Sequence, residues 1–195
     1  MLFLTRLRAH AYDVVQRALG LGLVRERVTR LMARAPAALI LDVGGGTGLY
    51  VPCLPSSARY VWLDLDPVKL AGFRARHGPR AAILADGSRL PLRDKSVDYV
   101  MCINVTHHLD DAQLERLFSE VARVTRGRVA LNDALRTTAW ASRLLWMLDG
   151  GSHPRPRAAL IAALERTHHI ESVEDYSRFH QYVLISASPL AQSAG

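Results

Sequence analysis

Short apolar runs alternate along the chain with longer stretches in which apolar residues recur every three or four positions. The short runs, rich in Val, Ile, Leu and Ala, have the length and composition of buried strands. Five of them are predicted to be strands: ALILDV (38–43), YVWLDL (60–65), RAAILAD (80–86), VDYVMCIN (97–104) and RVALND (128–133). Because these strands alternate with helical stretches, the sequence predicts a parallel sheet covered by helices on both faces.

The longer stretches predict three helices, over residues 1–34, 67–77 and 110–125. Asp66 followed by Pro67 provides a favourable cap and first position for the second helix. In the third helix the apolar residues share one face, namely Leu114, Leu117, Phe118, Val121 and Val124. This periodicity predicts a helix with one buried side.

Two apolar segments follow later in the chain, HHIESVEDY (168–176) and QYVLISAS (181–188). They predict a pair of strands joined by a short turn, and hence an antiparallel edge to the sheet. The predicted fold class is therefore α/β, a Rossmann-like doubly wound sheet of seven strands that is mostly parallel with an antiparallel edge strand. We expect a single domain over residues 1–195.

Composition and charge narrow the range of partners. With 195 residues, of which 49% are hydrophobic and 22% charged, the chain can bury one substantial core. The formal net charge of +7 arises from 25 basic and 18 acidic residues. The basic residues are mostly arginines spread along the chain, without a basic run or interleaved aromatic residues. A solvated arginine-rich surface is therefore favoured over a nucleic-acid interface.

Localisation signals point to a cytoplasmic protein. No apolar stretch approaches the roughly 20 residues needed to cross a bilayer, so no membrane span is expected. The opening MLFLTRLRAH is interrupted by Arg6 and Arg8, which argues against a signal peptide. Cys53 and Cys102 lack metal-ligand spacing, so they predict neither a metal site nor a disulfide framework, as is typical of a reducing compartment.

The stretch LDVGGGTG (41–48) places four glycines within five positions directly after a strand. Such a loop lies at the carboxyl edge of the sheet, where open α/β folds bind ligands. A plain glycine turn without a ligand is the alternative. Dinucleotide-binding enzymes seat a pyrophosphate on a related loop, but the carboxylate of Asp42 would repel phosphate. A ligand that carries an ammonium group would suit this position better.

Residues 41–109 resemble the class I S-adenosylmethionine-dependent methyltransferases, especially their small-molecule branch of the methyltransferase type 11 kind. The loop matches the family's D-x-G-x-G-x-G pattern at Asp42, Gly44, Gly46 and Gly48, with Gly45 where cysteine is common. The second strand ends with VWLDLDP, and ADGSRLPLRDKSVDYVMC resembles the third and fourth strand region of the family. Several landmarks in the right order make the resemblance more specific than any one of them.

The resemblance implies a binding site for S-adenosyl-L-methionine. The loop glycines would approach the amino-acid part of the cofactor, and Asp42 would help to place its ammonium group. The further implied contacts are Asp64 with the ribose hydroxyls, Leu65 with the adenine ring, Asp86 with the exocyclic amine, the Gly87 N–H with a ring nitrogen, and Asn104 near the methyl group. Asp64 has an alternative interpretation as a strand-end cap and Asp86 as a turn residue, whereas Asp98 is expected to be structural.

His107 and His108 follow the fourth predicted strand, where the family often carries a histidine pair. Either is a candidate catalytic proton acceptor, because imidazole titrates near neutrality, although a structural role is favoured for the pair. A nucleophile held in line with the methyl group needs a base only when it is a poorly acidic hydroxyl. His153 is a second candidate base.

The resemblance also divides the chain into segments. They are an N-terminal helical cap (1–36), a cofactor-binding core (37–136), a candidate substrate lid (137–160), and a C-terminal helix and strand pair (161–195). The candidate lid contains Trp140, Trp146 and several leucines, more apolar surface than a connecting helix requires. Packing of this segment on the sheet is the alternative.

The range of possible methyl acceptors is narrowed mainly by excluding classes of substrate. The region after the fourth strand reads NVTHH, without the Asn/Asp-Pro-Pro-aromatic segment of enzymes that methylate base amines and without the paired glutamates of protein arginine methyltransferases. The resemblance therefore favours methyl transfer to oxygen or carbon of a small, apolar acceptor such as a quinone, lipid or secondary metabolite. Two alternatives stay open: a cofactor-binding homologue with a non-methylating role, as a cyclase or partner subunit, and an RNA methyltransferase that uses the basic charge.

Overall fold

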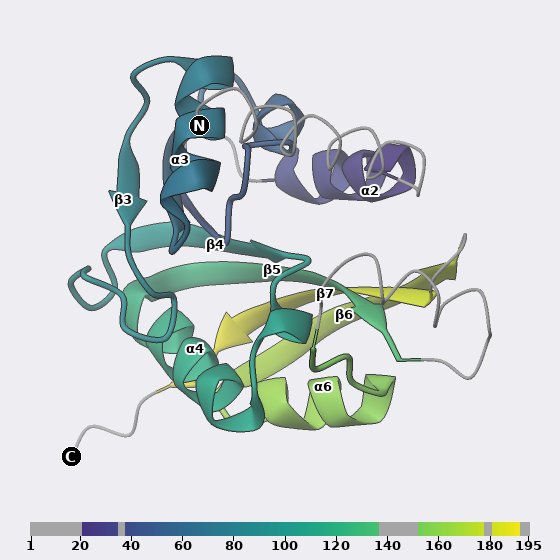
Figure 1. Ribbon diagram of the computed structural model, residues 1–195. Helices are drawn as coiled ribbons and strands as arrows, with labels where there is room; N and C mark the ends of the chain where they lie inside the picture. The colour runs from purple at the N-terminus through teal and green to yellow at the C-terminus, as the bar shows by residue number, and fades with distance from the viewer. Residues whose placement is uncertain (1–20, 35–37, 137–151, 178–180, 192–195) are drawn as a thin grey trace.

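A computed structural model of the protein describes residues 21–34, 38–136, 152–177 and 181–191 (Figure 1). Most of the predicted N-terminal helix and residues 137–151 of the candidate lid lie outside the described residues. The described part of the predicted helix is α2 (Leu21–Met32).

A seven-stranded sheet forms the centre of the fold, with the strand order β3-β2-β1-β4-β5-β7-β6. Its strands are β1 (Leu39–Val43), β2 (Arg59–Asp64), β3 (Ala82–Leu84), β4 (Val97–Ile103), β5 (Thr125–Leu135), β6 (His168–Ser177) and β7 (Gln181–Pro189). Neighbouring strands from β3 to β5 are parallel, and β7 is antiparallel to both β5 and β6. The predicted fold class is confirmed, and the antiparallel strand β7 lies one place inside the edge strand β6.

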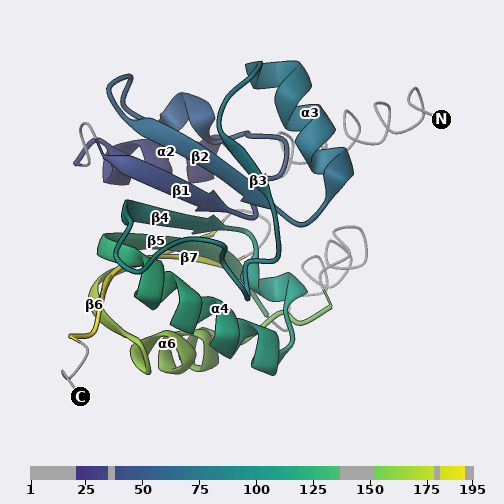
Figure 2. The same cartoon turned by 90° about the vertical axis from the view of Figure 1, so that its left-hand side faces the viewer.

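Helices cover both faces of this sheet. Figure 2 shows α2 and α3 (Pro67–His77) on one face and α4 (Asp111–Val124) and α6 (Arg157–Glu165) on the other. The predicted cap is confirmed, because the Asp66 carboxylate accepts a hydrogen bond from the Val68 N–H at 2.7 Å. Asp110 and Gln113 form a capping box that begins α4. Among the described residues, every helix is too short or too polar to span a bilayer.

The strands read as nearly continuous apolar runs because both of their faces are buried. Ile40, Trp62 and Met101 pack with Phe73 of α3 on one face. The intervening strand residues pack against α4 and α6 on the other face, among them Leu41, Leu63, Val100 and Cys102. The core therefore holds the central strands firmly and leaves their carboxyl ends at one edge.

Two strands differ in length from their predictions. Strand β3 covers only Ala82–Leu84 of the predicted 80–86, because it lies at the sheet edge and pairs with β2 alone. Strand β5 is longer than the predicted 128–133 at both ends, because Thr125 pairs with Val97 of β4 and β7 pairs with the strand as far as Leu135. Gly127 lies in the early part of β5, where a Cβ atom would collide with the Asp98 carbonyl oxygen.

Candidate functional site

A pocket of about 420 Å³ lies where the carboxyl ends of β1, β2 and β4 meet the loop after β3. Its volume is within the range of small-molecule sites. The predicted site residues that line it are Gly44, Gly45, Gly46, Asp64, Leu65, Asp86, Gly87, Asn104 and His108. Three predicted residues, Asp42, Gly48 and His107, do not line the pocket but lie close to residues that do.

The glycine loop adopts a conformation that side chains would obstruct. Gly44, Gly46 and Gly48 have φ angles of 71°, 52° and 74°, in the left-handed region that favours glycine. A Cβ atom at Gly44 would collide with Val105, and one at Gly48 would lie 2.7 Å from Phe73 and His77. At Gly46 the nearest heavy atom would be 4.0 Å away. The loop is therefore packed against the protein at both ends and is open in its middle.

Side chains from β2 and α3 hold three successive carbonyl groups of this loop. The indole Nε1 of Trp62 donates to the Gly46 oxygen at 2.8 Å, and Arg76 donates to the Thr47 oxygen at 3.2 Å. The His77 Nε2 lies 2.8 Å from the Gly48 oxygen, and as the protonated nitrogen of the ring it donates there. Burial lowers the pKa of His77. The loop is thus held in shape by the protein itself.

The N–H groups of the four loop glycines are also engaged within the protein. Those of Gly44 and Gly45 donate to the Leu63 oxygen at 2.8 and 3.0 Å, that of Gly46 to Asp64 at 2.9 Å, and that of Gly48 to the Gly45 oxygen at 2.9 Å. A phosphate-binding loop needs such donors for its anion. Three aspartates, Asp64, Asp66 and Asp86, line the same pocket and outnumber its one lining lysine among the described residues, Lys69. The pocket therefore favours a ligand that is cationic or rich in hydrogen-bond donors over a pyrophosphate.

Asp42 lies behind the loop. Its side chain is 1% exposed and accepts a hydrogen bond from the Tyr60 hydroxyl at 2.6 Å. Burial raises the pKa of Asp42 to about 7. Its predicted role toward a ligand ammonium group stays a prediction, and from this position the carboxylate would act through the loop or through water.

Asp64 and Asp86 are both tied into local turns while they line the pocket. Asp64 accepts hydrogen bonds from the N–H groups of Gly46 and Asp66, at 2.9 and 3.0 Å. It therefore caps the end of β2, as its alternative interpretation predicted. Each carboxylate oxygen can accept more than one hydrogen bond, and the side chain retains capacity for a ligand. Asp86 accepts from the Ser88 N–H at 2.8 Å, as expected of a turn residue, and is exposed.

Packing also requires glycine at the next residue, Gly87. A Cβ atom there would lie 2.8 Å from Val43 and 3.2 Å from Leu117. Val43 ends β1 and Leu117 lies on α4. The backbone of Gly87 therefore approaches the core closely at the floor of the pocket.

Asn104 joins a chain of polar side chains that sequence reasoning missed. Its backbone is left-handed, with a φ angle of 58°. Its side-chain oxygen accepts from Asn132 at 3.2 Å, and the Asn132 oxygen accepts from the Tyr176 hydroxyl at 2.5 Å. The amide nitrogen of Asn104 lies 3.4 Å from the hydroxyl of Tyr50, a residue that also borders the pocket. The polar Asn132 within an apolar strand was the one sequence signal for this network.

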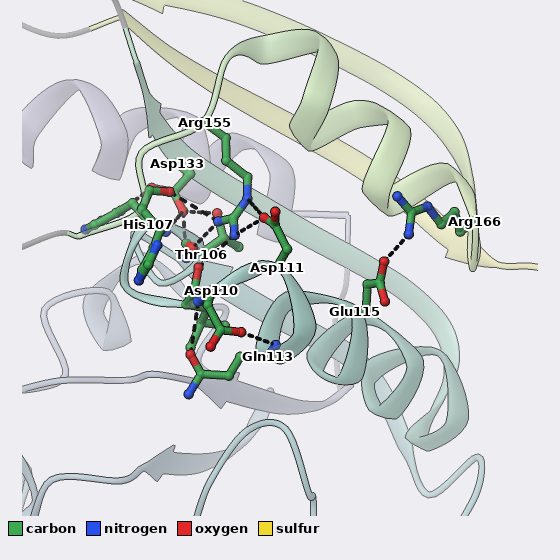
Figure 3. A network of polar contacts seen from close by, with 11 residues as sticks. Thr106, His107, Asp110, Asp111, Gln113, Glu115, Asp133, Arg155 and Arg166 are labelled. Atoms are coloured by element: carbon green, nitrogen blue, oxygen red, sulfur yellow. Dashed lines mark hydrogen bonds and ion pairs between the residues drawn. The ribbon is translucent and has the colours of Figure 1, made fainter.

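The histidine pair is divided between the core and the pocket. His107 is 4% exposed, and its Nδ1 lies 2.5 Å from the Asp133 carboxylate (Figure 3). His108, by contrast, is exposed and lines the pocket. The structural interpretation of the pair therefore suits His107. His153 is exposed and does not line the pocket, although its backbone N–H donates to the His107 oxygen at 2.9 Å.

Asp133 is the buried centre of this region and was not singled out from the sequence. Besides His107 Nδ1, its carboxylate accepts from the Thr106 hydroxyl and from the N–H groups of Thr106 and Ala134, at 2.7 and 2.8 Å. Burial raises the pKa of Asp133, but the charge and hydrogen bond of His107 bring it below its usual value. An ionised Asp133 therefore holds the 3-10 turn η2 (Thr106–His108) from the inside.

Comparisons with known proteins agree with this geometry. The profile of a protein family described as a methyltransferase domain matches residues 41–131. An uncharacterized methyltransferase of Mycobacteroides abscessus is 39% identical over 108 residues, which are 52% of this chain and 40% of that protein. A probable S-adenosylmethionine-dependent methyltransferase of Mycobacterium tuberculosis is 38% identical over 100 residues, or 50% of this chain and 35% of that protein. The aligned part is less than half of each of these curated relatives.

The fold has a close counterpart among solved structures. Magnesium protoporphyrin IX methyltransferase from Synechocystis PCC 6803, with bound SAH, superposes with a TM-score of 0.72 at 18% identity, covering 89% of this chain and 86% of that one. At this identity the likeness concerns the fold. Together with the matched methyltransferase domain and the glycine loop, it supports the resemblance of this chain to the class I S-adenosylmethionine-dependent methyltransferases.

Proposed function

We propose that this protein binds S-adenosyl-L-methionine in the pocket and transfers its methyl group to oxygen or carbon of a small, apolar acceptor. The observation that carries the proposal is the pairing of the Asp64 carboxylate with a loop whose four glycine N–H groups are engaged internally. Such a pocket has acceptors for ribose hydroxyls and for cationic groups, and its loop offers few donors to an anion.

The pocket residues fit the parts of this cofactor. Asp64 lies beside Gly46 and would accept from the ribose hydroxyls. Leu65, with 67% of its surface exposed, offers an apolar face that an adenine ring would cover. Asp86 and Gly87 follow at the same end and would meet the polar edge of the base. Asn104, Tyr50 and His108 would surround the opposite end, where the methyl group is transferred.

When bound, the cofactor supplies a sulfonium methyl group as the electrophile. The protein's own contribution is to hold an acceptor in line with that group, since proximity provides most of the rate. His108 is the pocket-lining imidazole and would take a proton from an acceptor hydroxyl. An acidic hydroxyl would need less help, so dependence on His108 distinguishes weakly acidic acceptors from acidic ones.

The charge of the surface supports a small acceptor over RNA. Eight arginines of the described residues pair with carboxylates, namely Arg27, Arg30, Arg123, Arg126, Arg128, Arg155, Arg157 and Arg166. These arginine side chains are therefore already engaged within the protein. An RNA-binding surface would need these side chains for phosphate groups.

Two measurements test the proposal. Calorimetric titration with S-adenosylmethionine and S-adenosylhomocysteine should show one site, and no binding of either would refute the cofactor assignment. Transfer of a labelled methyl group should then be measured with quinones, lipids, phenols and RNA as separate acceptor panels. Cofactor binding without transfer to any panel would favour the non-methylating alternative, and transfer to RNA alone would overturn the proposed acceptor.

A further inference from the structure

Arg155 donates five hydrogen bonds beside the turn that carries the histidine pair. Its side chain is 11% exposed, and all three guanidinium nitrogens donate hydrogen bonds (Figure 3). The acceptors are the Asp111 carboxylate at 3.0 and 2.7 Å, the Thr106 oxygen at 2.9 Å, the Leu109 oxygen at 2.8 Å and the His153 oxygen at 3.2 Å. Three of these acceptors are backbone carbonyls, so Arg155 fixes main chain.

Two of the carbonyls flank the histidine pair. Thr106 and Leu109 enclose His107 and His108, and the bonds from Arg155 join the two ends of this turn from the outside. From the inside, Asp133 accepts from the N–H groups of Thr106 and His107, at 2.7 and 3.3 Å. The turn is therefore held on both sides by oppositely charged groups.

The backbone at Arg155 is tied to the same region. The Arg155 oxygen accepts from the N–H of Arg136, just after β5, at 2.8 Å. Two residues earlier, the His153 N–H donates to the His107 oxygen at 2.9 Å. The end of β5, the segment at 153–155 and the turn at 106–109 therefore form one connected unit beside the pocket.

We propose that Arg155 is a positioning residue that fixes the turn at 106–109 and so presents His108 to the methyl-transfer end of the pocket. This inference rests on the proposed function only for the role of His108. The planar fork of arginine reaches several oxygens at fixed angles, whereas the ammonium group of lysine is a compact point charge. Lysine at this position would keep the charge and lose the geometry.

A simple surface ion pair between Arg155 and Asp111 is the competing explanation. Asp111 is 92% exposed, and ion pairs of this kind contribute little. If the ion pair were the function of Arg155, Asp111→Asn would have at least as large an effect as Arg155→Lys, because lysine keeps the charge. If the carbonyl contacts are the function, Arg155→Lys has a large local effect and Asp111→Asn a small one.

Amide hydrogen exchange in the ligand-free protein separates these explanations. The His108 and Leu109 N–H groups close the turn, by donating to the Val105 and Thr106 oxygens at 3.1 and 3.2 Å. In Arg155→Lys these two amides should exchange at least about tenfold faster, while the Asp111→Asn protein stays within about twofold of wild type. Arg157→Lys is the matched control. Arg157 lies two residues after Arg155 and makes a surface ion pair with Asp175 of β6. Unchanged exchange at both amides in Arg155→Lys would overturn the proposal.

The NMR signal of the His108 imidazole tests whether the turn presents this side chain to the pocket. With His108→Gln used for assignment, S-adenosylhomocysteine should shift this signal in the wild type, and the shift should fall by at least half in Arg155→Lys. An equal shift in both proteins would overturn the presentation of His108. Absence of S-adenosylhomocysteine binding to the wild type would refute the proposed function, while the exchange result would still decide whether Arg155 fixes the turn. Arg155→Gln serves in both measurements if the lysine variant does not fold.

Discussion

The carboxylate of Asp64 accepts a hydrogen bond from the backbone N–H of Gly46 at 2.9 Å, which joins the end of β2 to the middle of the glycine loop. One side chain thereby shapes the loop and lines the pocket. Its removal should affect ligand binding through both effects.

Asp64→Ala should weaken binding of S-adenosylmethionine by at least about 1.5 kcal/mol, through loss of charge-assisted hydrogen bonds. Titration calorimetry measures this directly. His153→Ala is the control and should bind as the wild type does, because the His153 side chain does not line the pocket. Equal affinity of Asp64→Ala and wild type would contradict the cofactor assignment.

Gly48→Ala should destabilise the protein by about 1–3 kcal/mol, because the residue has a φ angle of 74° and a Cβ atom would lie 2.7 Å from Phe73 and His77. Gly22→Ala is the matched control in α2, where nothing lies within 4 Å of the added atom. That variant should be as stable as wild type or slightly more stable. Urea unfolding measures both, and similar stabilities of the two variants would argue against close packing of the loop on α3.

His168 should make the protein sensitive to acid. The residue is 1% exposed, and burial lowers its pKa to about 4 from an ordinary value of 6.5. Since the unfolded chain binds the proton more readily, the contribution of His168 to stability is complete above pH 6.5 and is lost as pH falls toward 4.

Relative to His168→Gln, the wild type should therefore lose up to about 3 kcal/mol of unfolding free energy between pH 6.5 and pH 4. His169→Gln is the neighbouring control, since that side chain is exposed. Denaturant unfolding at a series of pH values gives the difference, and parallel curves for wild type and His168→Gln would show that His168 does not titrate abnormally.

Asp42 should change the stability with pH in the opposite direction to His168. Its pKa is raised by burial to about 7 from 3.8, so ionisation costs the folded state, and stability is lost as pH rises through about 7. Asp42→Asn should gain up to about 4 kcal/mol over wild type at pH 8 compared with pH 4. The same variant should bind S-adenosylmethionine less tightly at pH 8, because the carboxylate that we predict to help place the ligand ammonium group is gone. A stability difference that is constant with pH would contradict the shifted pKa.

The sequence predicted the central fold well because its signals are local. Strands β1 and β2 were predicted to within about one residue from apolar runs that end in a carboxylate, and α3 from its Asp66 cap. Strands β3 and β5 were less accurate because their ends depend on neighbouring strands. The polar TRGR that begins β5 gives no sign of a strand, although Gly127 is required there by the Asp98 backbone.

The site residues were likewise predicted where the signal is local and missed where it depends on distant parts of the chain. The loop glycines, Asp64, Asp86 and Gly87 lie in short motifs and were named from them, and the structure brings most of them to one pocket. Asp133, Tyr176 and Arg155 were missed, because their partners lie 26 to 49 residues away along the chain. Pairings over such distances are set by strand order and register rather than by local sequence.

Trp62 has a practical consequence through its bond to the Gly46 oxygen. Its indole is fully buried and stacks on Phe73, with ring centroids 5.4 Å apart, so its emission depends on the state of the loop above it. The chain has three tryptophans, and the other two are Trp140 and Trp146. Once these are replaced by phenylalanine, the fluorescence of a single tryptophan becomes a label-free optical signal of ligand arrival.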